Sequence, residues 1–202
     1  MLDHDPDTAL LVRIGRGDAA AVRLLVAAKL PRIIGLATRM LHDRAAAEDV
    51  AQDAFVRVWR TAATWQPGAA RFDTWLHTVV LNLCRDRLRR RRKLGREMGR
   101  EMGRETGREA TDGAVPDMPD PAPDAESSLI EAERDRTVAA AIARLPERQR
   151  DAILLVHYQD LSGAEAAAVL DVSIEALESL LARGRRTLRA RLCSSQEDDA
   201  HD

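Results

Sequence analysis

Residues 95–124 show no sustained apolar periodicity, and this interruption divides the 202-residue chain into two candidate modules. On both sides of it, apolar residues recur at helical spacing, as in the regular four-residue steps from Val50 to Ala62. Aromatic residues make up only 3% of the chain, and alanine, leucine and arginine dominate. Unbranched side chains lose little rotamer freedom in a helix, whereas strands draw on β-branched and aromatic residues. The sequence therefore predicts an all-α fold with two small helical domains joined by a flexible linker.

The predicted boundaries follow these changes in pattern. We expect an N-terminal domain at residues 1–93, a linker at 94–126, a C-terminal domain at 127–193 and an acidic tail at 194–202. The linker starts with a tandem tetrapeptide, GREM, GREM, GRET and GREA, and continues into a stretch rich in proline and aspartate. Regular glycines weaken a helix, and prolines extend the chain. We interpret the repeat as a tolerant tether that arose by replication slippage, rather than as a binding element.

Local signals mark the helix ends of the first module. Gly15 and Gly17 end a short amphipathic segment, and Asp18 has the composition and position of a helix N-cap. Pro31 falls inside the next apolar-periodic stretch, where it kinks the helix or splits it in two. After a loop with proline and glycine, one long helix is expected to begin at Phe72.

Charge is segregated along the chain, although the formal net charge is only −2. Residues 85–108 are strongly basic, whereas residues 112–133 carry acids and no lysine or arginine. Because the local field attracts phosphate, this distribution favours a nucleic-acid partner more than the total charge does. Cys84 and Cys193 lie far apart without a CxxC pair, which argues against a disulfide framework or a zinc site.

Neither the start of the chain nor its apolar runs indicate a membrane or an exported protein. The first residues, MLDHDPDTALL, have acids where a signal peptide has a basic region, and no apolar run approaches a membrane span. We therefore expect a cytoplasmic protein without direct membrane insertion. No cofactor or metal is expected, because the five histidines are scattered and no phosphate-binding glycine loop is present. These absences also argue against an enzyme.

The segment from Ala164 to Arg186 has the spacing of a helix-turn-helix. Ala167 is small where two helices must cross closely, and Asp171 falls in the turn, where a left-handed backbone is needed and aspartate is tolerated. Leu177 follows Ala167 by ten residues and would pack the second helix onto the first. Second helices of such motifs enter the DNA major groove. Taken alone, the pattern fits an ordinary helical hairpin with a basic, solvated face equally well.

Three motifs in a fixed order resemble the sigma factors of the extracytoplasmic-function group. They are AEDVAQDAFVRVW at residues 47–59, RFDTWLHTVVLNLCRDRLRRRR at residues 71–92, and LPERQRDAILLVHYQDLSGAEAAAVLDVS at residues 145–173. The resemblance covers nearly the whole chain except the linker and the tail. It implies an alternative sigma factor that binds core RNA polymerase and directs promoter-specific transcription initiation in a stress or envelope response. The partners it implies are the clamp helices and flap of core polymerase, promoter DNA and an anti-sigma factor.

The resemblance also implies which residues of the first module bind each partner. One helix would dock on the clamp helices through an acidic and amide face, although the same face also fits a solvated surface: Glu48, Asp49, Gln52 and Asp53. The promoter minus-ten strand would contact Trp65, Asn82, Arg85, Asp86 and Arg89. Arginines bind phosphate and stack on splayed bases, which suits a separated strand. Trp75 falls on the apolar face and is expected in the core, which leaves Trp65 as the exposed tryptophan.

In the second module, the resemblance places minus-thirty-five recognition on the second helix of the helix-turn-helix, with Ser173, Glu175, Glu178, Ser179, Arg183, Arg185 and Arg186. The chain departs from the family pattern at Glu178 and Leu180, where basic residues are common, and at Gly184, where alanine is usual. An acid near the groove repels phosphate, but glutamate also accepts a hydrogen bond from cytosine N4. These departures keep one alternative function open, a sigma-like mimic that sequesters an anti-sigma factor without driving transcription. A conventional helix-turn-helix repressor would not need the first module.

Overall fold

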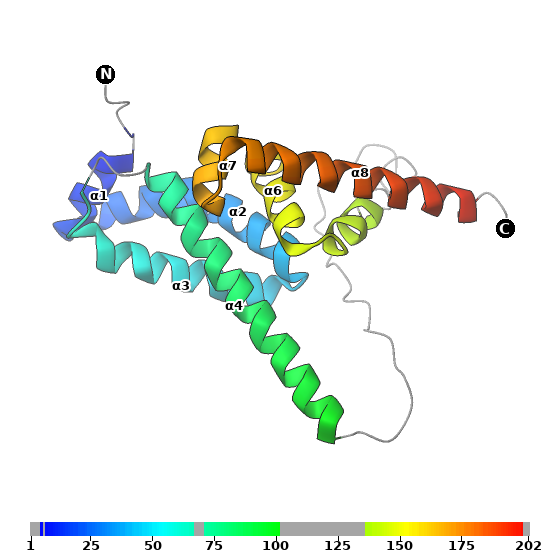
Figure 1. The fold of residues 1–202 in the computed structure, drawn as a ribbon. Helices are drawn as coiled ribbons and strands as arrows, with labels where there is room; N and C mark the ends of the chain where they lie inside the picture. The colour runs from blue at the N-terminus through cyan, green and yellow to red at the C-terminus, as the bar shows by residue number, and fades with distance from the viewer. Residues whose placement is uncertain (1–4, 6, 67–70, 102–135, 200–202) are drawn as a thin grey trace, which may run out of the picture. The chain divides into compact units, whose positions relative to one another are not determined.

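The computed structural model describes residues 5, 7–66, 71–101 and 136–199, and its regular structure within these ranges is entirely helical (Figure 1). The chain forms two compact units, residues 1–114 and 115–202. This agrees with the predicted all-α fold. None of the helices in the described ranges is both long and apolar enough to cross a membrane.

The first unit contains the helices α1 (Asp7–Gly15), α2 (Ala19–Leu41), α3 (Arg44–Ala62) and α4 (Phe72–Glu101). The helices α2 and α3 form an antiparallel pair, and both pack against α1 and the first half of α4. Each helix contributes its apolar stripe to one core, in which the largest fully buried side chains are Leu11, Leu25, Ile33, Leu36, Met40, Val50, Phe72, Leu76 and Leu81.

Capping residues determine where α2 and α3 begin. The carboxylate of Asp18 accepts hydrogen bonds from the backbone N–H groups of the first turn of α2, and it also forms an ion pair with Arg13 at 2.8 Å. His42 takes a left-handed conformation at the end of α2, and Asp43 then caps α3. Pro31 lies inside α2, which runs through it as a single helix and is not split.

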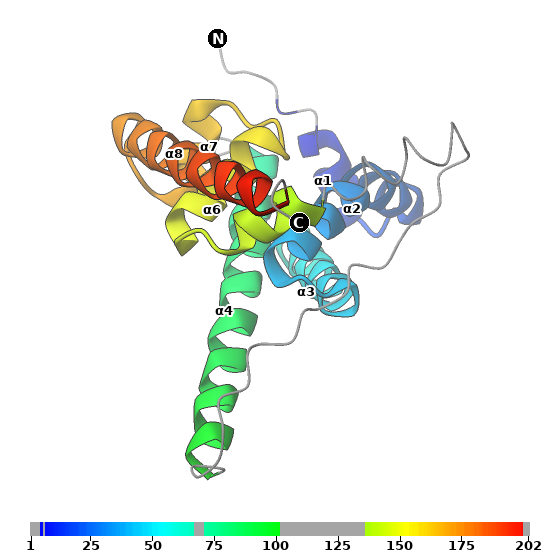
Figure 2. The same cartoon turned by 90° about the vertical axis from the view of Figure 1, so that its right-hand side faces the viewer.

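The helix α4 continues to Glu101, beyond the predicted domain end at residue 93 (Figures 1 and 2). Its second half extends past the other helices of the unit, and residues 89–96 are exposed. The helix therefore continues into the segment expected as the start of the linker. Once a helix is nucleated, each added residue gains a hydrogen bond, and the arginines and glutamates between the glycines of the repeat are good helix formers.

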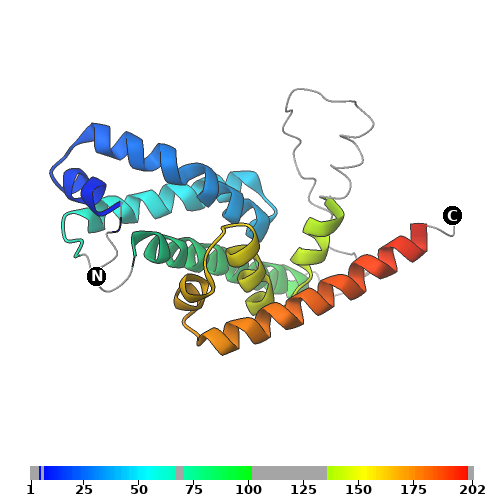
Figure 3. The same cartoon turned by 90° about the horizontal axis from the view of Figure 1, so that it is seen from above.

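The second unit contains a helical segment at residues 136–143 and the helices α6 (Glu147–His157), α7 (Gly163–Leu170) and α8 (Ile174–Asp199). Both α7 and α8 pack against α6, and their shared core includes Ile142, Leu154, Leu155, Ala166, Leu170, Leu177 and Leu181. The helix α8 extends beyond α6 and α7 and past the predicted domain end at residue 193 (Figure 3). Ser128 and Glu131, which have the spacing of a capping box, lie outside the described residues.

Candidate nucleic-acid and protein interfaces

The outward surface of α3 presents a row of three side chains, Glu48, Gln52 and Trp59. A helix with 3.6 residues per turn places them within about 40° of one another around its axis. Glu48 and Gln52 are exposed, and Trp59 is 44% exposed, with its ring against Phe55 at a centroid distance of 6.3 Å. Sequence reasoning missed Trp59, although its spacing of seven residues from Gln52 is two helical turns.

The other two predicted docking residues, Asp49 and Asp53, face α4 instead. The guanidinium of Arg87 on α4 lies 3.1 Å from the carboxylate of Asp49 and 3.6 Å from that of Asp53. Because both carboxylates are more than half exposed, these ion pairs add little to stability. They do link α3 to α4, so the predicted acidic face consists of an outward row and a row shared with the neighbouring helix.

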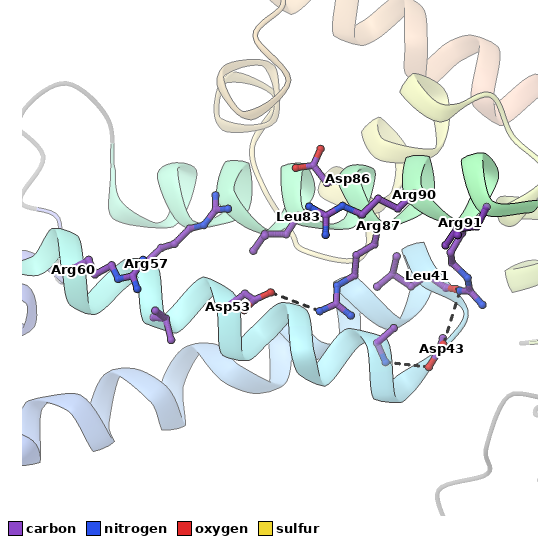
Figure 4. Close-up of a pocket in the computed structure, with 13 residues that line it drawn as sticks. Leu41, Asp43, Asp53, Arg57, Arg60, Leu83, Asp86, Arg87, Arg90 and Arg91 are labelled. Atoms are coloured by element: carbon purple, nitrogen blue, oxygen red, sulfur yellow. Dashed lines mark hydrogen bonds and ion pairs between the residues drawn. The ribbon is translucent and has the colours of Figure 1, made fainter. Parts of the chain in front are cut away.

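An open groove of about 650 Å³ lies between α3 and α4. Arg57 and Arg60 extend along it from α3, and Arg87 and Arg90 border it from α4 (Figure 4). The apolar part of its lining comes from Leu41, Ala46, Val56, Leu83 and Leu94. Five arginines and three aspartates line the groove, so its positive excess is small, and this excess favours an anionic group such as a phosphate or a carboxylate. No cluster of His, Cys, Asp or Glu side chains within the described ranges is arranged to hold a metal ion.

The minus-ten candidates on α4 share adjoining helical faces, as expected. Asn82, Asp86 and Arg89 lie within about 60° of one another around the axis, and Arg85 lies at the edge of this row. Asn82 and Arg89 are exposed, whereas Arg85 and Asp86 are half-buried. Asp86 forms an ion pair with Arg89 one turn later. The carboxylate therefore holds one of the two candidate arginines in the row.

The fifth minus-ten candidate, Trp65, belongs to an aromatic cluster at the start of α4. Its ring meets Phe72 and Trp75 edge-on, with centroid distances of 5.6 Å in both cases, and Phe72 and Trp75 stack at 5.8 Å. Phe72 is fully buried, whereas both tryptophans are half-buried. The expectation of an exposed Trp65 and a core Trp75 was wrong, because the two rings pack on each other over Phe72. The family resemblance also implies that the loop at residues 64–70 captures a flipped base, and residues 67–70 of this loop lie outside the described residues.

The helices α7 and α8 form the predicted helix-turn-helix. Ser162 and Glu165 make a reciprocal capping box at the start of α7. Asp171 takes the left-handed conformation in the turn, with φ 53° and ψ 56°. Ala167 and Leu177 are both buried, as expected for the crossing point of the two helices. The predictions for Ala167, Asp171 and Leu177 are confirmed.

The first turns of α8 direct a polar row away from its buried side. Glu175, Ser179 and Arg186 lie within about 40° of one another, opposite the buried Leu177 and Leu181. The guanidinium of Arg183 donates hydrogen bonds to the Ser179 hydroxyl at 2.7 and 3.2 Å. The exposed side chains of Glu178 and Arg185 flank the row.

Ser173 caps the helix that carries this row. Its hydroxyl oxygen accepts a hydrogen bond from the backbone N–H of Ala176 at 3.2 Å. Hydrogen bonds from the backbone N–H of Glu175 and from the Ser173 side chain lower the pKa of Glu175 below its usual 4.5. Glu175 is therefore ionised at neutral pH, and it lies at the end of the helix that enters the groove in such motifs.

The structure gives a reason for glycine at position 184. Gly184 is buried on the side of α8 that faces α6, and a Cβ atom there would lie 3.2 Å from Cγ1 of Ile153 and 3.6 Å from Cβ of Gln149. The missing side chain permits a close approach of the two helices. The departure from alanine is thus a packing feature and not a change in the surface that would face DNA.

Two family models match the chain, one to each unit. The model described as Sigma-70 region 2 matches residues 25–94, and the model described as Sigma-70, region 4 matches residues 135–188. The RNA polymerase sigma-H factor of Pseudomonas aeruginosa is 31% identical over 188 residues, which cover 93% of this chain and 94% of that protein. The ECF RNA polymerase sigma factor SigK of Mycolicibacterium vanbaalenii is 32% identical, with coverage of 90% and 86%.

Solved structures show the same architecture. CnrH, in complex with the cytosolic domain of CnrY, is similar to this chain with a TM-score of 0.66 and 26% identity, covering 94% of this chain and 99% of that one. The sigma factor RpoE of Bartonella quintana, in complex with the anti-sigma factor NepR, shares the fold with a TM-score of 0.58 at 23% identity, covering 85% and 96%.

Proposed function

The chain belongs to the RNA polymerase sigma factors of the extracytoplasmic-function group, which direct transcription initiation, and from this premise we propose which of its surfaces bind each partner. In this proposal, α3 docks on the clamp helices of core polymerase. The aromatic cluster and the outward row of α4 hold the separated minus-ten strand. The start of α8 reads the minus-thirty-five element, and the rest of the second unit contacts the polymerase flap.

The single observation that supports the docking assignment best is the exposed row of Glu48, Gln52 and Trp59. Interfaces are dominated by a few aromatic anchors with polar groups around them, and a row that ends in a tryptophan after an acid and an amide has this composition. The acidic and amide groups suit a basic partner helix, because complementary charge increases the rate of association. In this proposal Trp59 is the apolar anchor beside Glu48 and Gln52.

Replacing the anchor tests the docking surface. Trp59→Ala should weaken binding of the full chain to core polymerase by about 30-fold, since loss of an interface anchor costs about 2 kcal/mol or more. Leu24→Ala is the matched control, because Leu24 is a 55% exposed apolar residue on α2 of the same unit. Fluorescence titration of labelled protein with core polymerase gives both affinities. Equal losses in the two variants would exclude α3 as the docking helix.

The DNA assignments are supported by the different composition of the two proposed DNA surfaces. Two tryptophan rings lie at the start of α4 and arginines lie further along the same helix, and such a combination binds single strands through stacking and phosphate contact. At the start of α8, short polar and charged side chains lie on the outward side of a capped helix, which suits the edges of paired bases. The first surface thus fits a melted strand and the second fits duplex DNA.

Transcription by reconstituted polymerase separates the proposed initiation factor from a sigma-like mimic. Core polymerase with the full chain and a library of promoter sequences should yield transcripts from a subset that shares two spaced elements. Sequencing of these transcripts would define the promoter. A chain that binds core polymerase and an anti-sigma factor yet never initiates from any library member would be the mimic instead.

We further assign to this chain an anti-sigma partner and a stress or envelope response. The first assignment is supported by CnrH, whose structure was solved with the cytosolic domain of a partner protein. A small protein encoded next to this chain is the candidate to test, by adding it to the transcription reaction. Inhibition that excess core polymerase relieves would support occlusion of the docking surface, and inhibition unaffected by core polymerase would contradict it.

A further inference from the structure

The N-terminal segment of the chain is joined to the start of α4 by a long-range hydrogen bond. Oδ2 of Asp5 accepts a hydrogen bond from the backbone N–H of Phe72 at 2.6 Å, and Oδ1 of the same side chain accepts one from the N–H of Asp7 at 3.1 Å. The first N–H groups of a helix have no partner within the helix, and its N-terminus favours negative charge. Asp5 therefore caps α4 from a distant part of the chain.

A second connection is an ionic cluster among three helices. Nζ of Lys29 on α2 lies 2.6 Å from Oδ2 of Asp7 on α1 and 2.7 Å from Oδ1 of Asp73 on α4. The side chains of Lys29 and Asp7 are only 15% and 9% exposed. Burial alone lowers the pKa of Lys29, but its hydrogen bonds to the two carboxylates outweigh this effect and raise the pKa above 10.5. The ammonium group therefore stays charged, although burial raises the pKa of its partner Asp7 above the usual 3.8.

Both connections end on the first two residues of α4, next to the aromatic cluster. Phe72 is capped by Asp5 and supports the ring of Trp65, which meets it edge-on at 5.6 Å. Asp73 is the following residue and is held by Lys29. The orientation of Trp65 thus depends on a helix start that is fixed from α1 and α2. The region 2 match begins at residue 25, so α1 lies outside it.

We propose that Asp5 and the Asp7–Lys29–Asp73 cluster are positioning residues for the minus-ten contact, holding Phe72 so that Trp65 and Trp75 meet an unpaired base in one fixed arrangement. This role rests on the proposed function of the aromatic cluster. Preorganised aromatic side chains lose little freedom when they bind, which strengthens stacking. Without Asp5 and the Asp7–Lys29–Asp73 cluster, the rings would have to be ordered during promoter melting.

Two variants of these positioning residues test the role in the assembled holoenzyme. Asp5→Ala removes the cap, and Lys29→Met removes the charge at similar length. Each should weaken binding of a labelled single strand, taken from the non-template minus-ten region of a promoter selected in the library assay, by about tenfold, a part of what loss of stacking costs. Binding of core polymerase should stay unchanged. Asp5→Asn should retain most of the affinity, because its amide oxygen still accepts the Phe72 N–H.

A matched control separates positioning from general stability. Ile33→Val removes one methylene from a buried side chain of α2. It should lower the melting temperature of the first unit about as much as Asp5→Ala or Lys29→Met does, without changing strand binding. Near-ultraviolet circular dichroism should show a weaker tryptophan signal in Asp5→Ala and Lys29→Met and not in this control. Strand affinity that follows melting temperature across all variants, control included, would overturn the proposal.

The outcome for Trp65→Ala distinguishes this proposal from the proposed function. If Trp65→Ala weakens strand binding and Asp5→Ala and Lys29→Met do not, then the positioning role is wrong while the minus-ten assignment stands. If Trp65→Ala itself binds the strand normally, then the aromatic cluster is not the minus-ten contact, and the positioning role is refuted together with it. A Lys29→Met variant that folds and loses strand affinity supports the role even where Asp5→Ala fails to fold.

Discussion

The turn of the helix-turn-helix depends on one residue whose backbone conformation sets the angle between α7 and α8. Asp171 has φ 53° and ψ 56°, and the next N–H donates to the carbonyl of Ala167 at 3.1 Å. For L-residues this left-handed conformation costs about 1–2 kcal/mol, with less for aspartate, whose short polar side chain can hydrogen-bond locally. Substitutions at this position should therefore follow backbone preference and not side-chain size.

A graded series at Asp171 gives the expected magnitudes. Asp171→Gly removes the steric cost but loses about 0.5–1 kcal/mol of chain entropy, so the stability of the second unit should stay the same or rise slightly. Asp171→Asn should be neutral. Asp171→Val combines a β-branched side chain with positive φ and should destabilise the unit by about 2 kcal/mol, which for a domain of this size lowers the melting temperature by about 8 °C or more.

The tryptophans provide an internal control for this series. All three lie in the first unit, at positions 59, 65 and 75, so tryptophan fluorescence should report an unchanged melting transition. Faster hydrogen exchange of peptides from α7 and α8 should report the loss of stability that Asp171→Val causes in the second unit. Promoters with a minus-thirty-five element should lose activity with Asp171→Val more than promoters that lack one. If glycine and valine at this position gave equal exchange rates, the backbone argument would be refuted.

Three further predictions concern DNA binding, packing and pH. Arg85→Ala combined with Arg89→Ala should cripple open-complex formation, measured by permanganate reactivity, while polymerase affinity stays nearly intact; equal loss of both would contradict the strand-facing assignment. Gly184→Val should destabilise the second unit by about 1–3 kcal/mol through overpacking, whereas Gly163→Val, where a Cβ meets no atom within 4 Å, should cost clearly less in the same denaturant titration. The pKa of Asp18 lies below 3.8, chiefly because the side chain of Arg13 donates a hydrogen bond to its carboxylate. The ionised carboxylate therefore stabilises the folded state above about pH 3.8, and this stabilisation is lost as the pH falls through the lowered pKa. Asp18→Asn should therefore reduce stability at neutral pH, and the difference should shrink in acid-unfolding curves below about pH 3.8; a difference that persists there would mean that capping geometry, not charge, is responsible.

Features that depend on a few neighbouring residues could be predicted from the sequence. The cap at Asp18 and the left-handed Asp171 were predicted from residue type and spacing, because a cap or a turn satisfies its hydrogen bonds within about four residues. The helix ends without such signals were not predicted. Gly95 and Gly99 weaken the helix after the predicted end of the first domain but do not end it, so α4 continues to Glu101; no glycine or proline interrupts α8 between residue 193 and Asp199.

Features that depend on contacts between distant segments were out of reach of the sequence. Trp65 is 7 residues from Phe72 and 10 from Trp75, and whether it is exposed depends on how the loop between them closes. The Asp5 cap joins residues 67 positions apart. The role of Gly184 depends on the distance between α8 and α6 and not on its own helix. In each case the determining neighbour is absent from the local pattern.

The position of Arg87 decides how the docking surface has to be tested. Because this arginine lies within ion-pair distance of both Asp49 and Asp53, replacing either carboxylate changes the groove on the side of α4 as well as the charge offered to polymerase. A guanidinium that has lost one of its two carboxylate partners would add to the positive charge of the groove and increase non-specific strand binding. A loss of transcription in an Asp53 variant would therefore not identify its cause. Substitutions in the outward row, at Trp59 above all, leave this link intact and separate polymerase binding from DNA binding.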